Sequence, residues 1–290
     1  MAHISAQARR PMRLTAVVLN WKDPESTGQC VESLLRDQWI DSIVVVDNET
    51  EGKLRALRSD RVTVVEHSDN LGFSRGVNSG IRTALADGAD WVLAINNDAI
   101  LTSGAGAALV SAATSHEGAG ILAPRVANPD GSDQSTGGQF NPVTAGTRDK
   151  NNSRIDYFTW ACVLVPSTTF ERVGLLSEDY FMYWEDVDFG LRVRDAGLTL
   201  VAVNDAVVVH ELSKSHRRAG VRIDRYSAHG LTLLCLSRGG AARAVGLPYR
   251  LSRRLLARLT RPERFRAVLS GIRDGRHAYS MRRAGGERQL

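Results

Sequence analysis

The chain has 290 residues, of which 43% are hydrophobic, which is enough to bury the core of one large α/β domain with an appendage. Its charge is uneven, because residues 238–290 contain 14 arginines and three acidic residues, a net charge of +11, whereas the whole chain carries +5 and residues 1–237 therefore carry −6. Residues 1–13 are polar and no apolar run approaches about 18 residues, so we expect no secretory signal and no membrane-spanning helix, but a cytoplasmic protein whose basic tail meets an anionic surface.

Short β-branched runs alternate with helical stretches over the first 125 residues. The expected strands are Leu14–Leu19, Ile43–Val46, Val62–Val65 and Trp91–Ile95. The expected helices are Ser26–Arg36, Thr50–Arg58 and Gly72–Asp87. This alternation predicts an α/β fold with an open, mostly parallel sheet flanked by helices.

The rest of the chain is less regular. After a strand around Gly120–Val126, the Gly-, Asn- and Asp-rich stretch Asn128–Ser153 is too long for a plain connection, which predicts a mobile or binding loop. Further elements are expected at Asp156–Val165 (strand), Glu185–Ala196 (helix), Leu198–Val203 (strand) and Ala206–Val209 (strand). The tail is expected to be helical, because leucines recur at every fourth position from Leu247 to Leu259 and Pro262 can begin another helix.

Polar residues follow all four strands of the first half. The strands end at Asn20, at Asp47 and Asn48, near His67 to Asn70, and at Asn96, Asn97 and Asp98. Parallel strands bring their carboxyl ends to one edge of the sheet, where such folds bind ligands. We therefore expect these side chains to line one crevice.

Two of these strand ends carry a carboxylate that can bind a ligand. Asp98 can ligate Mg²⁺ or Mn²⁺ and, through the ion, a diphosphate; the alternative is an Asx turn. His210 follows an apolar run and can complete such a divalent site or be structural. Asp47 can accept a hydrogen bond from a ring N–H of a nucleotide base, or it can cap a helix.

The segment Asn70–Asn78 combines glycines with a basic residue before an expected helix. Gly72 lets a backbone approach a ligand closely, and Arg75 can meet a phosphate or a base carbonyl. The helix N-terminus that follows favours anions. A purely structural junction between loop and helix is the alternative.

Aromatic residues and carboxylates gather between residues 180 and 188. Aromatic side chains at 180, 181, 183 and 184 precede Glu185, Asp186 and Asp188 at the start of an expected helix. A carboxylate beside an aromatic wall can act as a general base on a hydroxyl. The three can instead stabilise the helix dipole, and for Asp188 we expect a pair with Arg192 one turn on.

Taken in chain order, six stretches resemble the family 2 glycosyltransferases, in particular their bacterial rhamnosyltransferase-like branch. They are Val18-Leu-Asn-Trp21, Val45-Val-Asp-Asn48, Asn70-Leu-Gly-Phe-Ser-Arg-Gly76, Asn96-Asn-Asp98, Tyr183-Trp-Glu-Asp-Val-Asp188 with Arg192, and Ala206-Val-Val-Val-His210. The resemblance covers about residues 13–212 and implies the GT-A fold. It implies a catalytic domain (13–220) with a Rossmann-like nucleotide-binding half (about 13–125) and an acceptor half (about 126–220). Outside it, we expect a flexible arm (1–12) and a basic helical C-terminal region (221–290).

The resemblance also implies a role for each matching residue. Asp47 would read the base, and Asp98 would hold Mg²⁺ or Mn²⁺ as the last residue of a D-x-D-type motif, with His210 as a further ligand. Asp186 would be the catalytic base and Glu185 the neighbouring candidate. The residues that would frame the nucleotide-sugar are Asn20, Asn70, Gly72, Arg75 and Asn97. Because the motif is Asn-Asn-Asp here, with a single acid, modest metal affinity is expected.

The function expected from these residues is inverting transfer of a sugar from a nucleoside diphosphate-sugar. We expect dTDP-rhamnose first and a UDP-sugar next, with a glycan or polyprenyl-diphosphate-linked saccharide of the bacterial cell envelope as acceptor. The basic tail would hold the enzyme peripherally on the inner face of the membrane, although a helical cap that packs on the domain is the alternative.

Two other classes stay open. A sugar-phosphate nucleotidyltransferase would be expected to carry a Gly-rich loop after the first strand, where this chain has Asn20-Trp-Lys-Asp-Pro24. A non-catalytic basic protein could bind nucleic acid or membrane. The tail aromatics Tyr249, Phe265 and Tyr279 lie too far apart for a base-stacking platform, so no nucleic acid is expected as a partner.

Overall fold

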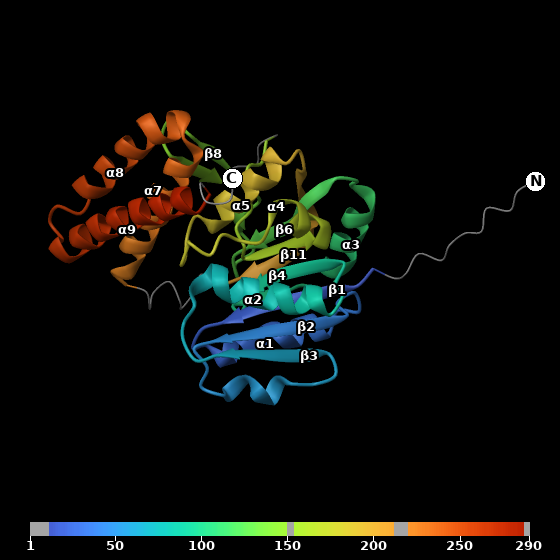
Figure 1. Cartoon of the computed structure of the whole chain (residues 1–290). Helices are drawn as coiled ribbons and strands as arrows, with labels where there is room; N and C mark the ends of the chain where they lie inside the picture. The colour runs from blue at the N-terminus through green and yellow to red at the C-terminus, as the bar shows by residue number, and fades with distance from the viewer. Residues whose placement is uncertain (1–11, 150–153, 212–219, 287–290) are drawn as a thin grey trace, which may run out of the picture.

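We describe the fold from a computed structural model, in which residues 12–149, 154–211 and 220–286 are described (Figure 1). The arm expected at residues 1–12 therefore lies almost wholly outside the described residues. The strands of the main sheet are β1 (Leu14–Asn20), β2 (Ser42–Asn48), β3 (Val62–His67), β4 (Trp91–Asn96), β5 (Ala99–Leu101), β6 (Ala119–Ala127), β7 (Asp133–Ser135), β10 (Cys162–Pro166) and β11 (Thr199–His210). A separate hairpin consists of β8 (Gly138–Asn141) and β9 (Gly146–Asp149). The helices are α1 (Pro24–Leu35), α2 (Gly72–Ala86), α3 (Ala105–Ser115), α4 (Ser167–Val173), α5 (Glu185–Asp195), α7 (Arg222–Arg238), α8 (Leu247–Leu256) and α9 (Pro262–Gly286), with short turns η1 (Lys53–Leu57) and η2 (Ala242–Gly246).

The main sheet has nine strands in the order β3-β2-β1-β4-β10-β6-β11-β5, and β7 pairs with β6. Strands β3, β2, β1 and β4 run parallel to one another, as the sequence predicted. β10 runs antiparallel between β4 and β6, whereas β6 and β11 are parallel again. In this register Asn20 lies opposite Asp47, so the predicted strand ends do share one edge of the sheet.

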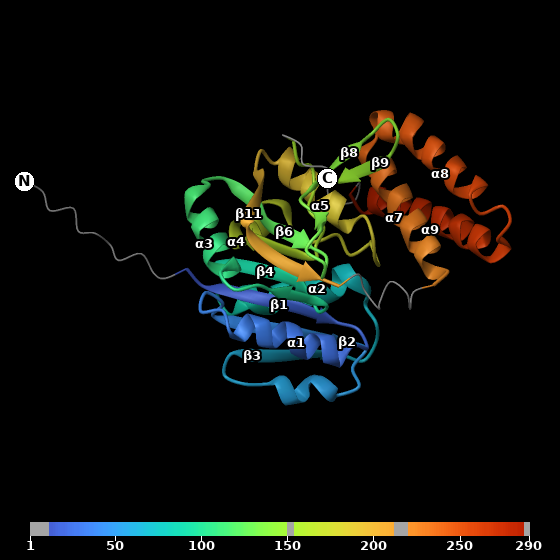
Figure 2. The same ribbon diagram turned by 180° about the vertical axis from the view of Figure 1, so that it is seen from behind.

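Helices cover both faces of the sheet. Helix α2 lies on one face, where Val77 and Ile81 pack in the same core as residues of α4 and α5 (Figure 1). Helices α1 and α3 cover the opposite face, where Leu34 and Leu109 share the other core (Figure 2). The mixed, mostly parallel sheet between two helical layers is the predicted α/β architecture.

Several elements differ from the expectation. The helix predicted at Thr50–Arg58 is only the 3₁₀ turn η1, and the two strands predicted after residue 197 form one strand, β11, with an irregularity between Val203 and Val207. Helix α3 was not predicted, because its sequence AGAALVSAATS consists largely of small residues without a clear apolar stripe. The predicted loop at Asn128–Ser153 contains β7 and the β8–β9 hairpin, and its residues 150–153 lie outside the described part.

The C-terminal region forms a helical layer beside the sheet, as predicted. Helix α9 packs closely against α7, and two glycines of α9 allow this approach. A Cβ atom at Gly271 would lie 2.2 Å from the carbonyl oxygen of Arg225, and one at Gly275 would lie 2.6 Å from that of His229. Leu231 and Leu234 of α7 join Trp184 in a third core that ties this layer to α5. In the part of the chain that the structure describes, no helix combines the length and apolarity that crossing a bilayer requires.

Candidate active site

A pocket of about 840 Å³ opens at the carboxyl edge of the parallel strands. The ends of β1 and β4 and the residues after β2 line one part of it, and the segment that precedes α5 lines another. The strands β7 and β11, the first turns of α7, the start of α2 and the segment before β10 contribute the rest. Six of the predicted site residues line this pocket: Asn70, Gly72, Asn97, Asp98, Glu185 and His210.

Asp98 and His210 form a close pair in the wall of the pocket. They are 112 positions apart in sequence and meet because β5, which begins directly after Asp98, pairs with the end of β11, so that Ala99 lies opposite His210. The Nε2 atom of His210 lies 3.0 Å from Oδ1 of Asp98, and the two side chains are only 10% and 11% exposed. Sheet topology therefore creates a pair that the sequence spacing does not show.

Gln134 on β7 orients the ring of His210. Its Oε1 lies 2.5 Å from His210 Nδ1, while its Nε2 donates to Oδ1 of Asn128 and to the backbone carbonyl of His210. Because these bonds set which end of the amide accepts, Nδ1 carries a proton, and a neutral ring turns the lone pair of Nε2 toward Asp98. A proton on Nε2 or a cation bound to both atoms would satisfy this contact, and Nδ2 of Asn96 lies 3.3 Å from the same ring nitrogen.

A divalent cation fits this pair. Neighbouring ligands of an octahedral ion with bonds of about 2.1 Å lie about 3.0 Å apart, which is the separation of the two acceptor atoms. Among the residues that the structure describes, no cluster of three or more His, Cys, Asp or Glu side chains is arranged to hold a metal. In such a site the protein would supply two ligands, and substrate phosphates and water would take the other positions. The imidazole favours Mn²⁺ over Mg²⁺.

A smaller pocket adjoins the main one, since Lys22 and Glu49 line both. Asn20 and Asp47 line this smaller pocket, and each is 3% exposed. Asp47 accepts hydrogen bonds from Nδ2 of Asn20 at 2.7 Å and from the hydroxyl of Thr50 at 2.6 Å. A carboxylate has about four lone-pair sites, so Asp47 retains the capacity to accept a bond from a base N–H.

The loop before α2 is shaped by its own hydrogen bonds. Oδ1 of Asn70 accepts from Nδ2 of Asn48 and from the backbone N–H of Gly72. Gly72 has a φ of +80°, and a Cβ atom there would lie 2.5 Å from the carbonyl oxygen of Phe181. Glycine is therefore needed because the loop approaches the segment of Phe181, and not because a ligand approaches the loop.

Arg75 and Asn97, both expected beside the nucleotide-sugar, differ in their position relative to the pocket. The side chain of Arg75 is 57% exposed and lies 3.8 Å from Glu178, and it is not among the residues that line the pocket. Asn97 does line the pocket, but its Nδ2 is directed to the hydroxyl oxygen of Thr27 at 3.1 Å. The structure thus brings Asn97 to the site and leaves Arg75 outside it.

Of the three carboxylates in the first turn of α5, Glu185 is the one that lines the pocket. It is 6% exposed, and its Oε2 is buried without a hydrogen-bond partner among the described residues. Burial, and then the charges of Asp186 and Asp188, raise the pKa of Glu185 well above its usual range. A carboxyl group of raised pKa with an unsatisfied oxygen in a cavity can exchange a proton with a ligand hydroxyl.

A strained turn presents Glu185 to the pocket. The two preceding residues, Tyr183 and Trp184, have φ values of 72° and 76°, in the left-handed region that residues with a Cβ rarely adopt. Such strain persists only where the surroundings enforce it, and it gathers at functional sites. Here Gly230 of α7 leaves room for the turn, because a Cβ atom at that position would lie 2.5 Å from the carbonyl oxygen of Tyr183.

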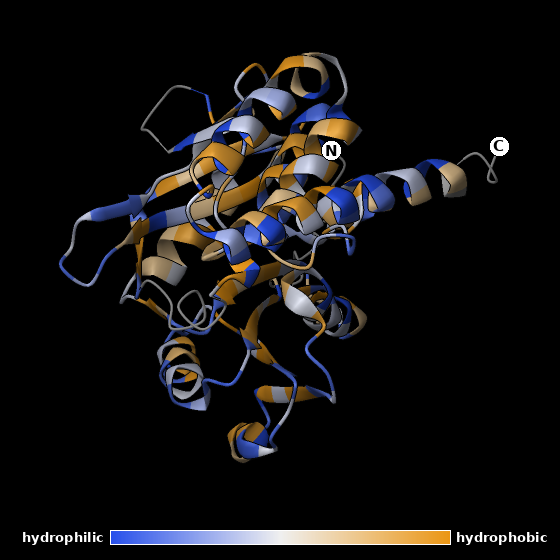
Figure 3. Ribbon diagram, turned by 90° about the vertical axis from the view of Figure 1, so that its left-hand side faces the viewer, coloured by the Kyte–Doolittle hydropathy of each residue, from blue (hydrophilic) through white to orange (hydrophobic). Residues whose placement is uncertain are grey.

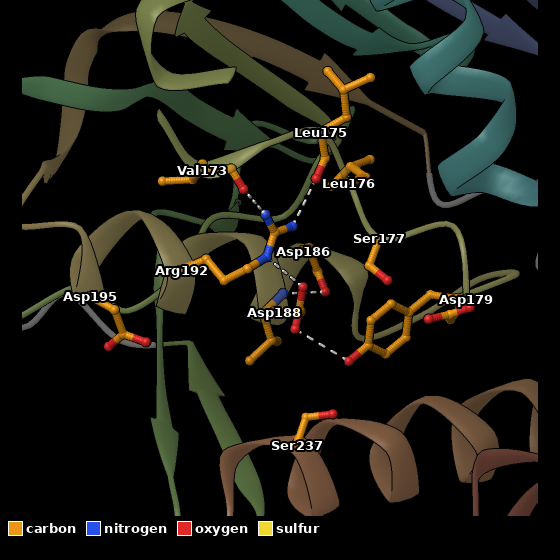
Figure 4. A network of polar contacts seen from close by, with 12 residues as sticks. Val173, Leu175, Leu176, Ser177, Asp179, Asp186, Asp188, Arg192, Asp195 and Ser237 are labelled. Carbon is orange, nitrogen blue, oxygen red and sulfur yellow. Dashed lines mark hydrogen bonds and ion pairs between the residues drawn. The ribbon is translucent and has the colours of Figure 1, made fainter. Parts of the chain in front are cut away.

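Asp186 and Asp188 are not among the lining residues of the pocket. Asp186 accepts a hydrogen bond from the next backbone N–H at 2.8 Å. Figure 4 shows Asp188 beside Arg192, which donates to it at 2.9 Å and also donates to the carbonyls of Val173 and Leu175. The predicted pairing of Asp188 with Arg192 is confirmed, and it secures the first turn of α5.

Other lining residues were not found by sequence reasoning. Tyr226 of α7 stacks on Phe181 with ring centroids 4.5 Å apart, and Nε1 of Trp160 is buried without a partner among the described residues. The missed residues are Gln134, Trp160, Arg222 and Tyr226. Gln134 lies in the stretch predicted as a binding loop, so its region was identified; the others lie in segments to which no motif pointed.

Comparisons with known proteins agree with this geometry. A model of the family described as "Glycosyltransferase like family 2" matches residues 11–225. The N-acetylglucosaminyl-diphospho-decaprenol L-rhamnosyltransferase of Mycobacterium tuberculosis is 31% identical over 210 residues, which cover 61% of this chain and 68% of that protein.

Solved structures show the same fold at low sequence identity. GalNAc-T7 with UDP, GalNAc and Mn²⁺ has a TM-score of 0.57 and is 13% identical; the match covers 83% of this chain, which spans only 54% of that one. The mannosyltransferase PcManGT from Pyrobaculum calidifontis, in complex with GDP-Man and Mn²⁺, has a TM-score of 0.55 and is 15% identical, and the match covers 95% of this chain and 79% of that one. The family match decides against a nucleotidyltransferase and against a non-catalytic binding protein. The chain belongs to the family 2 glycosyltransferases, and it is a glycosyltransferase with the GT-A fold.

Proposed function

We propose that the chain transfers a sugar, with inversion at the anomeric carbon, from a nucleoside diphosphate-sugar to a hydroxyl of a lipid-linked saccharide. The observation that carries the proposal is that one pocket contains both the Asp98–His210 pair and the buried carboxyl of Glu185. The first can neutralise a diphosphate, and the second can accept a proton. The pocket that holds Asp47 adjoins them, and the carboxylate of Asp47 can accept a further hydrogen bond there from a base N–H.

The two adjoining pockets bind different parts of the donor. The base binds at Asp47 and the diphosphate beside Asp98 and His210, which would hold a divalent cation; the cation would supply positive charge to offset that of the departing diphosphate. The acceptor hydroxyl loses its proton to a carboxylate as its oxygen attacks the anomeric carbon from the face opposite the diphosphate. The bond to the diphosphate breaks in the same step, through an oxocarbenium-like transition state.

Glu185 and Asp186 together supply the base. The family pattern favours Asp186, whereas Glu185 lines the pocket and has a raised pKa, which suits a base that works near neutral pH. The charge of Asp186 raises the pKa of Glu185, so the two carboxyl groups are linked. Single substitutions at the two positions separate proton transfer from binding of the acceptor.

The names of the relatives support a donor and an acceptor for the proposed reaction. The mycobacterial relative is named a rhamnosyltransferase that acts on N-acetylglucosaminyl-diphospho-decaprenol, which supports dTDP-rhamnose as donor and a polyprenyl-diphosphate-linked saccharide of the cell envelope as acceptor. A UDP-sugar is second, in line with the UDP bound to GalNAc-T7. A lipid-linked acceptor also favours a peripheral position on the inner face of the cell membrane.

The test is release of nucleoside diphosphate by the purified chain with dTDP-rhamnose, UDP-N-acetylglucosamine or GDP-mannose. N-acetylglucosaminyl-diphospho-polyprenol serves as acceptor, and Mn²⁺, Mg²⁺ or a chelator is added. We expect release only with metal and acceptor, fastest with dTDP-rhamnose, and a product of inverted anomeric configuration by NMR. Release that is equal in the chelator would contradict the metal site, and absence of release with all three donors would contradict the proposed donors.

A further inference from the structure

Helix α8 and the turns on either side of it expose four large apolar side chains. Val245, Tyr249, Leu256 and Leu259 are 50%, 42%, 65% and 61% exposed, and we call them the α8 ridge. Tyr249 and Leu256 are two helical turns apart and share one face of α8, whereas Val245 lies in η2 before the helix and Leu259 in the turn after it. Single exposed leucines are common on protein surfaces, but several exposed apolar side chains along one short segment mark an interaction site.

The opposite face of α8 is fixed to the rest of the protein. Arg254 donates to the hydroxyl of Ser227 at 2.8 Å, and Arg258 pairs with Asp224 of α7 at 3.1 Å. Arg264, at the start of α9, also pairs with Asp224, at 3.3 Å. The ridge therefore faces outward because the inward positions are occupied by anchoring arginines.

Positive charge surrounds the ridge. Arg253 and Arg261 are exposed, and Arg253 donates to the hydroxyl of Tyr249 at 2.9 Å. The tail from residue 238 onward carries a net charge of +11. Figure 3, in which the helices of the C-terminal region face the viewer, shows hydrophobic and hydrophilic segments interspersed along them. An apolar stripe edged by arginines matches the boundary between lipid headgroups and acyl chains, whereas a second copy of the same face would be repelled by its like charge.

The α8 ridge is connected to the pocket through helix α7. Asp224, to which the turn between α8 and α9 is tied, lies between Arg222 and Tyr226, and both of these line the pocket. Because Asp224 is two residues from each of them on the helix, it lies on the opposite face of α7, so a surface that rests on the ridge is separated from the pocket wall by about the width of one helix. A lipid-linked acceptor would reach the pocket from that surface around α7.

We propose that the α8 ridge docks the protein on an anionic bilayer and holds the wall of the pocket formed by α7 near the lipid surface. The proposal deepens the proposed function, because the purpose of docking rests on a lipid-linked acceptor, but the docking itself is measured without any substrate. A failure of docking and a failure of the proposed transfer are therefore distinguishable.

The experiment is co-sedimentation of the full chain with vesicles of phosphatidylcholine, with and without phosphatidylglycerol, at low and high salt. We expect binding only to the anionic vesicles, weakened by high salt. The double variant L256S/L259S should lower the partition coefficient about tenfold or more, because two buried leucines are lost. The double variant R253Q/R261Q should also lower it about tenfold or more, because two charges near the surface are lost.

Trp39→Ser is the matched control, since Trp39 is 43% exposed but lies between α1 and β2, outside the C-terminal region. It should bind vesicles as the unaltered chain does. Circular dichroism of L256S/L259S checks that the helices persist, and a loss of binding without a loss of helix supports the proposal. Equal binding by L256S/L259S and the unaltered chain would overturn it. So would a dimer in light scattering that L256S/L259S dissociates, because the ridge would then be an interface between copies.

Discussion

Gln134 offers the sharpest test of the Asp98–His210 site. Replacing it with methionine keeps the length of the side chain but removes the acceptor that lies 2.5 Å from Nδ1 of His210. The ring is then free to carry its proton on Nε2, which faces Oδ1 of Asp98 at 3.0 Å. In that tautomer Nε2 of His210 donates a hydrogen bond to Asp98, so neither atom has a lone pair directed at a metal.

Two routes give the same magnitude for this change. A hydrogen bond to a group that becomes charged or metal-bound contributes about 1.5–3 kcal/mol, which corresponds to about 10- to 150-fold in an equilibrium constant. Loss of a residue that orients a metal-ligating histidine costs about 10- to 100-fold in metal affinity. We therefore expect Gln134→Met to raise the Mn²⁺ concentration for half-maximal activity about 10- to 100-fold, with turnover at saturating Mn²⁺ changed by less than about threefold.

The assay is release of nucleoside diphosphate as a function of Mn²⁺, with Mn²⁺ binding measured independently by calorimetry. Asn128→Ala is the matched control, because it removes the partner of Gln134 Nε2 at 2.9 Å and leaves the bond to His210 in place. It should shift the Mn²⁺ dependence by no more than about threefold. Unchanged Mn²⁺ dependence in Gln134→Met, or an equal shift in Asn128→Ala, would refute the orienting role.

Three further outcomes are expected around the aromatic segment. Glu185→Gln and Asp186→Asn should be compared by single-turnover kinetics; the variant that loses about 10²- to 10⁴-fold in turnover identifies the base, and a partner that changes only the acceptor KM identifies the residue that binds the acceptor. Because the pKa of Glu185 is raised in the folded protein, its carboxyl holds its proton while the unfolded chain releases it, so the free energy of unfolding falls as pH rises above the usual glutamate range. The free energy of unfolding of Glu185→Gln, measured with urea, should therefore rise relative to that of the unaltered protein as pH rises from 4 to 8. A difference in unfolding free energy that stays constant over this range would contradict the raised pKa. Gly72→Ala combines left-handed strain with a Cβ atom 2.5 Å from the carbonyl oxygen of Phe181, so denaturation should show a loss of about 2–4 kcal/mol.

The parallel half of the fold was predictable because each strand is a short β-branched run bounded by polar residues. Leu14–Asn20 and Ser42–Asn48 differ from the predicted strands by one or two residues at their ends. The order of the later strands was not predictable, because β10 inserts antiparallel between β4 and β6 through pairing that no local pattern encodes. Helix α3 was missed because its alanines and glycines pack by small size, and so leave little apolar periodicity to detect.

The site was predictable to the extent that a strand end fixes a position. Asp98 and Asp47 end parallel strands, and the rule that ligands bind at that edge placed both beside pockets that adjoin each other. Arg75 was judged from its residue type alone, and its exposed side chain beside Glu178 shows that the direction of a helical side chain cannot be inferred in that way. Gln134 and Tyr226 enter through β7 and α7, whose placement against the pocket depends on the whole tertiary fold.

The contrast between Asp188 and Glu185 separates residues kept for stability from residues kept for chemistry. Asp188 is buried like Glu185, but Arg192 and the start of α5 satisfy its charge, so it contributes to the fold. Glu185 has an oxygen without a partner among the described residues, and it follows two left-handed residues with side chains, Tyr183 and Trp184. An unsatisfied buried group costs about 1–3 kcal/mol and each left-handed residue about 1–2 kcal/mol, against a net stability of about 5–15 kcal/mol for a typical protein. Selection for folding alone would remove such a segment. Its presence in the pocket wall therefore indicates a functional role for Glu185 on grounds that do not depend on any relative.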